Sequence, residues 1–286
     1  MSAAPRLGGQ ALIEGVMVRA GGRWAAAARR PDGTIVTTEA EVPGWALSGR
    51  GVPVVRGMIA LVATIGLGMK ALSWSRSVAE EEPTPKGTVV AATLVSIAVF
   101  VSVFALVPAL VARLAADRVA GGGVLFALAE ALTRVALFVG YVAAIGRLPG
   151  IRRTFEYHGA EHKAIAAQEH GDELTVERVS RYSPLHARCG TDFLVLVAVV
   201  AIAAFALVSP ESWLLLAASR VLLLPVVAGV AYEVLRVSDR PVPARWLKPL
   251  MAPGLAVQGL TTRPPSDDQV EVAIVAVQAA VAPVAR

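Results

Sequence analysis

Long apolar runs constrain the fold of this chain more than any other feature. A helix needs about 20 apolar residues to cross the hydrocarbon core of a bilayer. Four runs stand out against that requirement: Thr88–Ala112, Val124–Ile145, Phe193–Val208 and Trp213–Leu235. The sequence therefore predicts a mainly α, polytopic helical membrane protein with about four transmembrane helices.

The composition supports this prediction. Hydrophobic residues make up 55% of the 286 residues and charged residues only 17%, whereas a typical soluble domain has about 25% charged residues. An ordinary soluble enzyme and a disordered chain are therefore excluded. Cys189 is the single cysteine, so an internal disulfide is excluded as well.

The runs pair into two helical hairpins with polar segments around them. The first fifty residues predict a small β element, since two extended stretches flank the turn signal Pro31-Asp32-Gly33. The predicted parts are the N-terminal cytoplasmic β element (1–50), an interfacial or re-entrant helix with an acidic linker (51–87), the first hairpin (88–146), a cytoplasmic loop (147–190), the second hairpin (191–236) and a cytoplasmic tail (237–286).

Two segments are predicted within the tail. Residues 244–259 resemble a short interfacial helix interrupted by prolines. The stretch from Ser266 to Gln269 matches a capping box and predicts the start of a C-terminal helix. We expect this final helix to pack on the cytoplasmic domain, because it carries little positive charge.

Basic residues predict the orientation in the membrane. They gather in the N-terminal region, in the loop between the hairpins and in the tail, whereas the opposite side has only Arg113 and Arg118. The positive-inside rule then places both termini and the middle loop in the cytoplasm, with the chain in the inner cell membrane. The net charge of +5 is an orientation signal, so we expect a lipid bilayer and no nucleic acid as partner, and a homo-oligomer or partner protein stays open.

The stretch Val54–Trp74 allows two interpretations. It is apolar, but it carries Arg56 and Lys70 near its ends. A crossing here would spoil the charge asymmetry, which favours an interfacial or re-entrant helix. A fifth crossing is the alternative.

The histidines form a cluster that composition alone does not explain. All four lie from His158 to His186, and Cys189 follows three residues after the last of them. On the helix predicted before Gly171, His158 and His162 are four residues apart and share a face, with Glu161 beside them. The string His-x-x-Glu-His is the order found in inverzincins, in which two imidazoles bind a metal and the carboxylate activates water.

Two coordination schemes compete for this cluster. The candidate ligands are His158, His162, His186 and Cys189. Together they would close a tetrahedral structural site, whereas three of them would leave one position open and make Glu161 a general base. Glu233 is an alternative ligand at the end of the fourth run. The expected cofactor is a divalent metal, with zinc as the first choice.

Three charged residues lie in the interior of the apolar runs, away from their ends. Glu130 and Arg134 are four residues apart in the second run, and Arg220 lies in the fourth. An ion pair between the first two, shared with Arg220, would offset the cost of burial and fix helix packing. The alternative is a polar path for a substrate or ion.

Taken together, the motifs described above and the segments around them resemble the YqhQ-like family of bacterial membrane proteins, whose members are regarded as predicted metal-dependent enzymes. The matching stretches are Gly9–Arg19, Arg56–Gly57 with Gly68–Leu72, Phe155–Lys163, His186–Thr191, Arg220–Arg236 and Gln258–Ala273. The resemblance implies an integral membrane protein with a metal site, but no particular reaction.

We therefore predict a metal-dependent hydrolase at the cytoplasmic membrane face. His158, His162 and His186 are the favoured ligands, Cys189 or Glu233 the further one, and Glu161 the catalytic base. The alternatives are a non-enzymatic membrane scaffold with a structural metal and a transport-related protein that uses the intramembrane charges.

Overall fold

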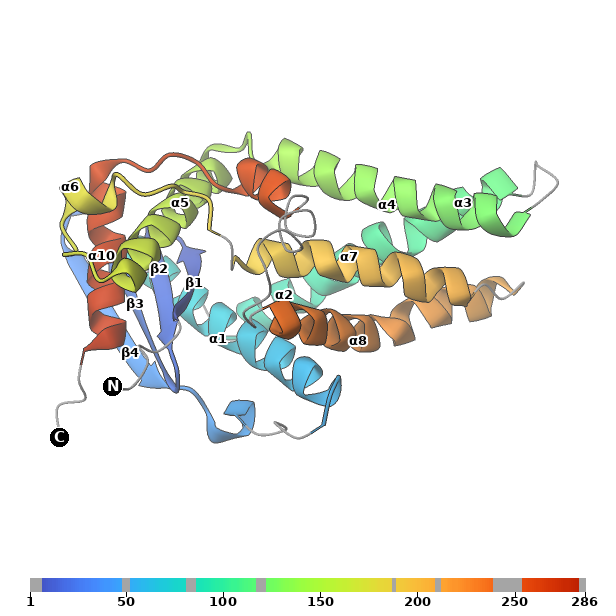
Figure 1. Cartoon of the computed structure of the whole chain (residues 1–286), viewed down its shortest axis with the longest axis horizontal. Helices are drawn as coiled ribbons and strands as arrows, with labels where there is room; N and C mark the ends of the chain where they lie inside the picture. Colours follow the sequence, from blue (N-terminus) through green and yellow to red (C-terminus); the bar gives the residue numbers. More distant parts are fainter. Residues whose placement is uncertain are drawn as a thin grey trace.

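Helices dominate the computed structural model, and a small antiparallel sheet lies at one end of them (Figure 1). The structure describes residues 7–47, 52–80, 86–116, 122–186, 189–208, 212–238 and 254–282. Most of the predicted acidic linker and most of the predicted interfacial segment of the tail lie outside the described residues.

The sheet has four strands in the order of the sequence. They are β1 (Leu7–Leu12), β2 (Gly15–Ala20), β3 (Arg23–Arg29) and β4 (Ile35–Glu41). The predicted turn before β4 is confirmed, with the Asp32 carboxylate accepting the Thr34 N–H across 2.8 Å and Gly33 at a φ of 87°. A two-residue loop containing Gly21, at a φ of 60°, joins β2 to β3. These turns leave β1 and β4 as the sheet edges.

Helices cover both faces of the sheet. Val16, Val18 and their neighbours pack against α5 (Pro149–His170) and α10 (Asp267–Val281). Met17 and Trp24 face the other way, toward α1 (Val55–Ala79). This alternation follows from the period of two in an extended strand. The predicted capping box of α10 is present, since Gln269 Oε1 accepts the Ser266 N–H at 2.9 Å.

The remaining long helices form a bundle that extends away from the sheet (Figure 1). They are α2 (Lys86–Val101), the π-helical segment η2 (Ser102–Leu106), α3 (Val107–Ala116), α4 (Gly122–Ile145), α7 (Gly190–Leu207) and α8 (Trp213–Ser238). Shorter helices are η1 (Gly44–Leu47), α6 (Val176–Val179) and one over residues 254–261. Large apolar side chains of the bundle are exposed, among them Leu94, Leu132, Leu214 and Leu222, as expected of a lipid-facing surface.

Within the described ranges of the chain, four helices are long and apolar enough to cross a membrane: Val55–Ala79, Gly87–Ala115, Leu125–Ile145 and Trp213–Arg236. The predicted number of spans is thus confirmed, but one of the four segments differs from the predicted set. The apolar part of α7, Phe193–Leu207, is shorter than the others, whereas the stretch with two possible interpretations belongs to a helix long enough to span. Apolar length alone did not separate these two segments.

Helix α1 connects the bundle to the sheet (Figure 1). It is one unbroken helix of 25 residues. Near its start Gly57 touches Gly229 of α8, and a Cβ on Gly57 would lie 2.9 Å from the Gly229 Cα. Further along, Leu67 and Ala71 are buried against the sheet. The second half of α1 is therefore covered by protein.

A buried ion-pair network joins α4 to α8. Glu130 binds Arg134 at 2.7 Å and Arg220 at 2.8 Å, and all three side chains are buried. The predicted ion pair, shared with Arg220, is therefore present. Arg220 also donates to the Val208 carbonyl at 2.6 Å, just beyond the last residue of α7, and Arg134 donates to the Phe104 carbonyl in η2 at 3.0 Å. The network thus satisfies carbonyls that irregular helix geometry leaves free.

Candidate metal centre

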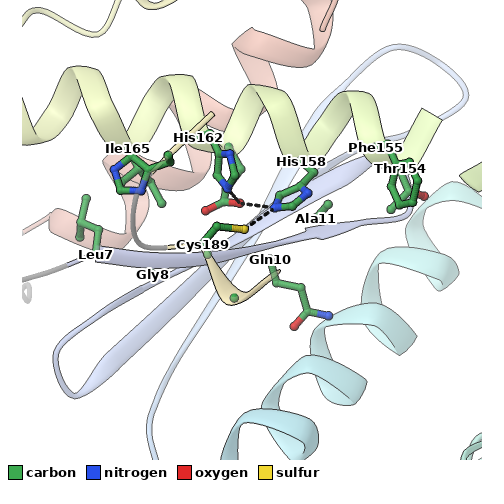
Figure 2. A pocket seen from close by; sticks show the side chains of 14 residues that line it. Leu7, Gly8, Gln10, Ala11, Thr154, Phe155, His158, His162, Ile165 and Cys189 are labelled. Carbon is green, nitrogen blue, oxygen red and sulfur yellow. Dashed lines mark hydrogen bonds and ion pairs between the residues drawn. The ribbon is translucent and has the colours of Figure 1, made fainter. Parts of the chain in front are cut away.

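Helix α5 carries three of the predicted site residues on one face. Pro149 lies in its first turn, where a missing N–H costs nothing. Gly171 ends the helix in the left-handed conformation, at a φ of 76°, as the sequence predicted. The helix lies over β1, so that His158, Glu161 and His162 lie near the edge of the sheet (Figure 2).

Main-chain carbonyls orient both imidazoles. The Nδ1 atom of His158 lies 2.9 Å from the Thr261 oxygen, and the Nδ1 atom of His162 lies 2.5 Å from the Pro184 oxygen. A carbonyl only accepts, so each Nδ1 carries the hydrogen and each Nε2 keeps its lone pair. This outer hydrogen bond is the one that metal-binding histidines almost always make.

The candidate ligand atoms of three residues converge. The Nε2 atom of His158 lies 3.2 Å from the Cys189 Sγ, and the ligand atoms of His158, His162 and Cys189 all lie within 4.8 Å of one another. Donors around a tetrahedral zinc ion are about 3.3–3.6 Å apart. The three side chains therefore fit a single ion, and Figure 2 shows them pointing toward one another.

Burial keeps both imidazoles neutral. Removal from water lowers the pKa of His158. It lowers the pKa of His162 to about 3, with the neighbouring His158 adding to the effect. Both rings are thus in the form that binds a metal at neutral pH.

Glu161 lies between the two histidines. Its Oε2 atom is 4.0 Å from the His158 Nε2 and 3.8 Å from the His162 Nε2. The side chain is buried, which raises the pKa of its carboxyl group to about 8. A Cβ on Gly9 of β1 would overlap this carboxylate, so the main chain of β1 lies directly against it.

A cavity of about 270 Å³ opens beside these residues. Residues Leu7–Ala11 of β1 form one wall and α5 forms another. Cys189 and His186 lie on a third side, at the start of α7. The convergent ligand atoms therefore face a space large enough for part of a small ligand.

Comparison with known proteins places this architecture in a family. Residues 52–283 match the proteins of unknown function designated DUF1385. The chain belongs to the DUF1385 family. It is also 34% identical to the protein described as uncharacterized protein YqhQ of Bacillus subtilis (strain 168), over 94% of this chain and 90% of that protein. The resemblance to the YqhQ-like family is thereby confirmed. No solved structure matches the chain.

Two of the predicted ligands of this DUF1385 protein, His186 and Glu233, contact other residues in the structure. His186 lines the cavity, but its Nε2 lies 3.4 Å from the Glu169 carboxylate and its ligand atoms are not within the convergent group. Gln258 holds the main chain of His186 by two hydrogen bonds, at 3.0 and 2.8 Å. Glu233 is bound by Arg56 at 2.7 Å and by the Val54 N–H at 3.3 Å, so its carboxylate serves the contact between α1 and α8.

Sequence reasoning missed the residues that hold the site in place. Gly159 allows the chain at Arg263 to cross α5 closely, because a Cβ on Gly159 would overlap the Arg263 carbonyl oxygen. The Arg263 N–H donates to the Phe155 carbonyl at 2.9 Å, and this crossing brings the Thr261 carbonyl to His158. The glycine between His158 and Glu161 was the available signal. Gly8 and Gly9 also lie at the site, because both belong to β1.

Proposed function

We propose that this DUF1385 protein is a metal-dependent hydrolase with its centre at the sheet end of the helical bundle. His158, His162 and Cys189 would hold the ion. The supporting observation is that two histidines with carbonyl-fixed Nδ1 atoms direct their free Nε2 atoms toward one buried thiol.

The donor set suits zinc better than magnesium or calcium. Imidazole and thiolate are borderline and soft ligands, whereas the two harder ions prefer oxygen. Three protein ligands beside a cavity are typical of catalytic rather than structural zinc sites. When bound, the ion supplies Lewis acidity to a substrate carbonyl or phosphoryl group.

Glu161 is the group that we assign to proton transfer. Its Oε2 lies within 4.0 Å of both Nε2 atoms, so a bound cation would lie close to it and favour the ionised carboxylate. The carboxylate would then take a proton from water held in the cavity and return it to the leaving group. Gly9 and α5 enclose the carboxylate and keep bulk water from it. His186 would contribute to the cavity wall and not to the ligand set.

The bundle suggests where the reaction takes place. We infer a multi-pass protein of the inner cell membrane, with the sheet, the site and both termini in the cytoplasm. The basic residues gathered in the segments outside the bundle support this orientation. The site would then act at the cytoplasmic face of the membrane. A metal that only stabilises the loop, without catalysis, is the scaffold alternative.

A second candidate function rests on the contact between His158 and Cys189. An imidazole 3.2 Å from a thiol, with its other nitrogen held by a carbonyl, is also the arrangement of a nucleophilic cysteine and its base. Cys189 directly precedes α7, and a helix N-terminus favours the thiolate. This candidate needs no metal, so metal content separates it from the first.

Metal analysis of the full chain tests the proposal. The protein is purified in detergent without chelators, and metals are counted by mass spectrometry. We expect about one equivalent of zinc in the wild type and in Glu161→Gln, with a large loss in His162→Ala and Cys189→Ser. His170→Ala is the matched control, because the His170 Nδ1 bonds Ala166 O of its own helix at 2.7 Å and its ring packs on Tyr182 rather than on the candidate ligands.

The outcomes separate the candidates. A wild type without stoichiometric metal, but with a Cys189 that reacts rapidly with iodoacetamide, would favour the thiol mechanism and remove the metal proposal. Stoichiometric metal together with full function in Glu161→Gln would favour the scaffold.

A further inference from the structure

The cavity beside the candidate metal centre follows an edge of the sheet. Five consecutive residues of β1, Leu7–Ala11, line it. In the described part of the chain β1 pairs with β2 alone, as the first strand in the sheet order. One side of its main chain therefore has no partner strand, and that side lies at the site.

The register identifies which main-chain groups face outward. The Arg29 N–H donates to the Glu14 carbonyl at 2.8 Å. Glu14 directly precedes β2, so its even-numbered position marks the side of the strand that faces β3. Main-chain groups alternate between the two sides of a strand. The even-numbered residues of β2 therefore bond to β3, and the odd-numbered residues bond to β1. The pairing between β1 and β2 then turns the N–H and C=O groups of Leu7, Gly9 and Ala11 away from the sheet.

Gly9 brings this free edge to the reacting groups. Its main chain lies against the Glu161 carboxylate, where a Cβ would overlap. Figure 2 shows β1 passing beneath His158 and His162, with Cys189 beside it. A second strand paired with Gly9 would therefore lie next to the ligand atoms.

The neighbouring residues leave room beside the edge. A Cβ added to Gly8 would meet nothing within 4 Å. The Gln10 side chain points to α1, where its Oε1 would lie 2.5 Å from a Cβ on Gly68, and so away from His158 in Figure 2. The side chains of an added strand would therefore lie in open space at Gly8, and no β1 side chain would obstruct them there.

We propose that the substrate is a polypeptide segment, bound in extended form as an additional strand on β1 and hydrolysed at a peptide bond. This inference rests on the proposed hydrolase function. The reaction consumes one water: its hydroxyl adds to the carbonyl carbon, the C–N bond breaks, and the water's proton passes through Glu161 to the amine that leaves. The products are a carboxylate and an amine.

A peptide matches this edge better than a lipid does. The outer edge of β1 presents an N–H donor and a C=O acceptor at every second residue. Only another extended main chain supplies the complementary pattern of donors and acceptors. A lipid ester has acceptors but no N–H donors, so it would leave the Leu7, Gly9 and Ala11 carbonyls unpaired. The edge therefore selects for backbone and not for a particular side chain.

Peptide cleavage is tested with the metal-loaded full chain in detergent. A peptide library prepared from a bacterial proteome is incubated with the protein at stoichiometric concentration, and new termini are identified by mass spectrometry. We expect new termini with the wild type and none with Glu161→Gln. Phosphatidylglycerol vesicles are assayed in parallel for released fatty acid.

Backbone methylation tests the pairing without changing the protein. A cleaved peptide is resynthesised with one N-methyl group at each successive position. Pairing with β1 predicts that methylation at every second residue lowers kcat/KM about tenfold or more, because those N–H groups face the strand, while the residues between tolerate it. A methylation profile without this period of two would overturn strand addition.

Proline substitutions test the same edge from the protein side. Ala11→Pro removes an outward N–H, and we expect it to lower kcat/KM about tenfold with metal retained. Thr37→Pro is the matched control on the opposite edge strand β4, where the register also turns the N–H outward, and it should cleave like the wild type. Unchanged cleavage by Ala11→Pro would contradict the proposal.

Failure of this inference differs from failure of the proposed function. Stoichiometric metal with no new peptide termini, or with fatty acid release alone, overturns the peptide substrate and leaves the metal hydrolase in place. A wild type that binds no metal overturns the proposed function itself.

Discussion

The Nε2 atom of His158 lies 3.2 Å from the Sγ of Cys189, although 31 residues separate them in the chain. One belongs to a helix over the sheet and the other directly precedes a helix of the bundle. The contact therefore joins the two parts of the molecule at the candidate site. Any change in how the bundle sits on the sheet would alter this distance.

Gly9→Ala should disturb Glu161 selectively. The added methyl group overlaps the buried carboxylate, and overpacking of this kind costs about 1–3 kcal/mol. We expect lower thermal stability and lower hydrolytic activity, with zinc retained on the three ligands. Gly8→Ala is the matched control, since its Cβ meets nothing, and an equal loss in both variants would contradict this role of Gly9.

The metal-free protein should lose stability as pH rises. Burial raises the pKa of Glu161 to about 8 from an ordinary value of 4.5, so the folded state favours the protonated form. The contribution of the protonated Glu161 carboxyl group to the free energy of unfolding is present in full below pH 4.5 and is lost as pH rises toward 8. We expect the Tm of chelated protein to fall over this range by less in Glu161→Gln than in the wild type.

A control variant and the opposite effect of His162 both bear on this pH experiment. Glu177→Gln changes an exposed carboxylate on α6 and should keep the wild-type pH dependence. His162 acts in the opposite direction, because burial lowers its pKa to about 3; its contribution is present above pH 6.5 and is lost as pH falls toward 3. Identical Tm profiles for Glu161→Gln and the wild type would show that Glu161 is not buried as described.

Glu130→Gln should destabilise the bundle. It removes the only carboxylate that binds both Arg134 and Arg220 among the described residues, and leaves two buried cations together. Breaking a buried pair costs about 3–5 kcal/mol. Thermal unfolding in detergent should show the loss, whereas Glu177→Gln, which breaks an exposed pair, should cost less than about 1 kcal/mol. A stable but inactive Glu130→Gln protein would instead support a transport role.

Gly57→Ala should loosen the contact between α1 and α8. Its Cβ would lie 2.9 Å from the Gly229 Cα and from the Tyr232 Cβ, so the helices must separate. Gly66→Ala is the control on the same helix, because the added Cβ meets nothing within 4 Å. Alanine has a higher helix propensity than glycine, so this variant should be more stable than the wild type by up to about 1 kcal/mol. Opposite shifts of Tm are therefore expected, and equal shifts would contradict the close crossing.

Sequence reasoning succeeded where the signal is local. Helix α5 and its glycine end, the turn at Asp32, and the capping box at Ser266 each depend on residues within a few positions of one another. The shared face of His158 and His162 follows from helical spacing alone. The ion pair of Glu130 and Arg134 has the same origin.

The contacts of the remaining candidate ligands depend on residues distant in the chain. His186 and Glu233 have the right chemistry for a ligand, but Gln258 bonds the main chain of His186 and Arg56 binds the Glu233 carboxylate. Nothing near either residue in the chain predicts those partners. The buried guanidinium of Arg220 likewise bonds the Val208 carbonyl, just beyond the last residue of α7, which is a contact between segments 12 residues apart.

Apolar length, charge distribution and helical period, all present in the sequence, determined a helical membrane protein with a small sheet and with two histidines on one helix face. These properties depend on neighbouring residues and on transfer from water, so they need no knowledge of the fold. Only the tertiary structure decided that the Cys189 thiol lies beside the His158 and His162 side chains and that the edge strand β1 lies beside Glu161. Those contacts join residues that are distant in the chain, and packing of the whole molecule determines which of many possible partners meet.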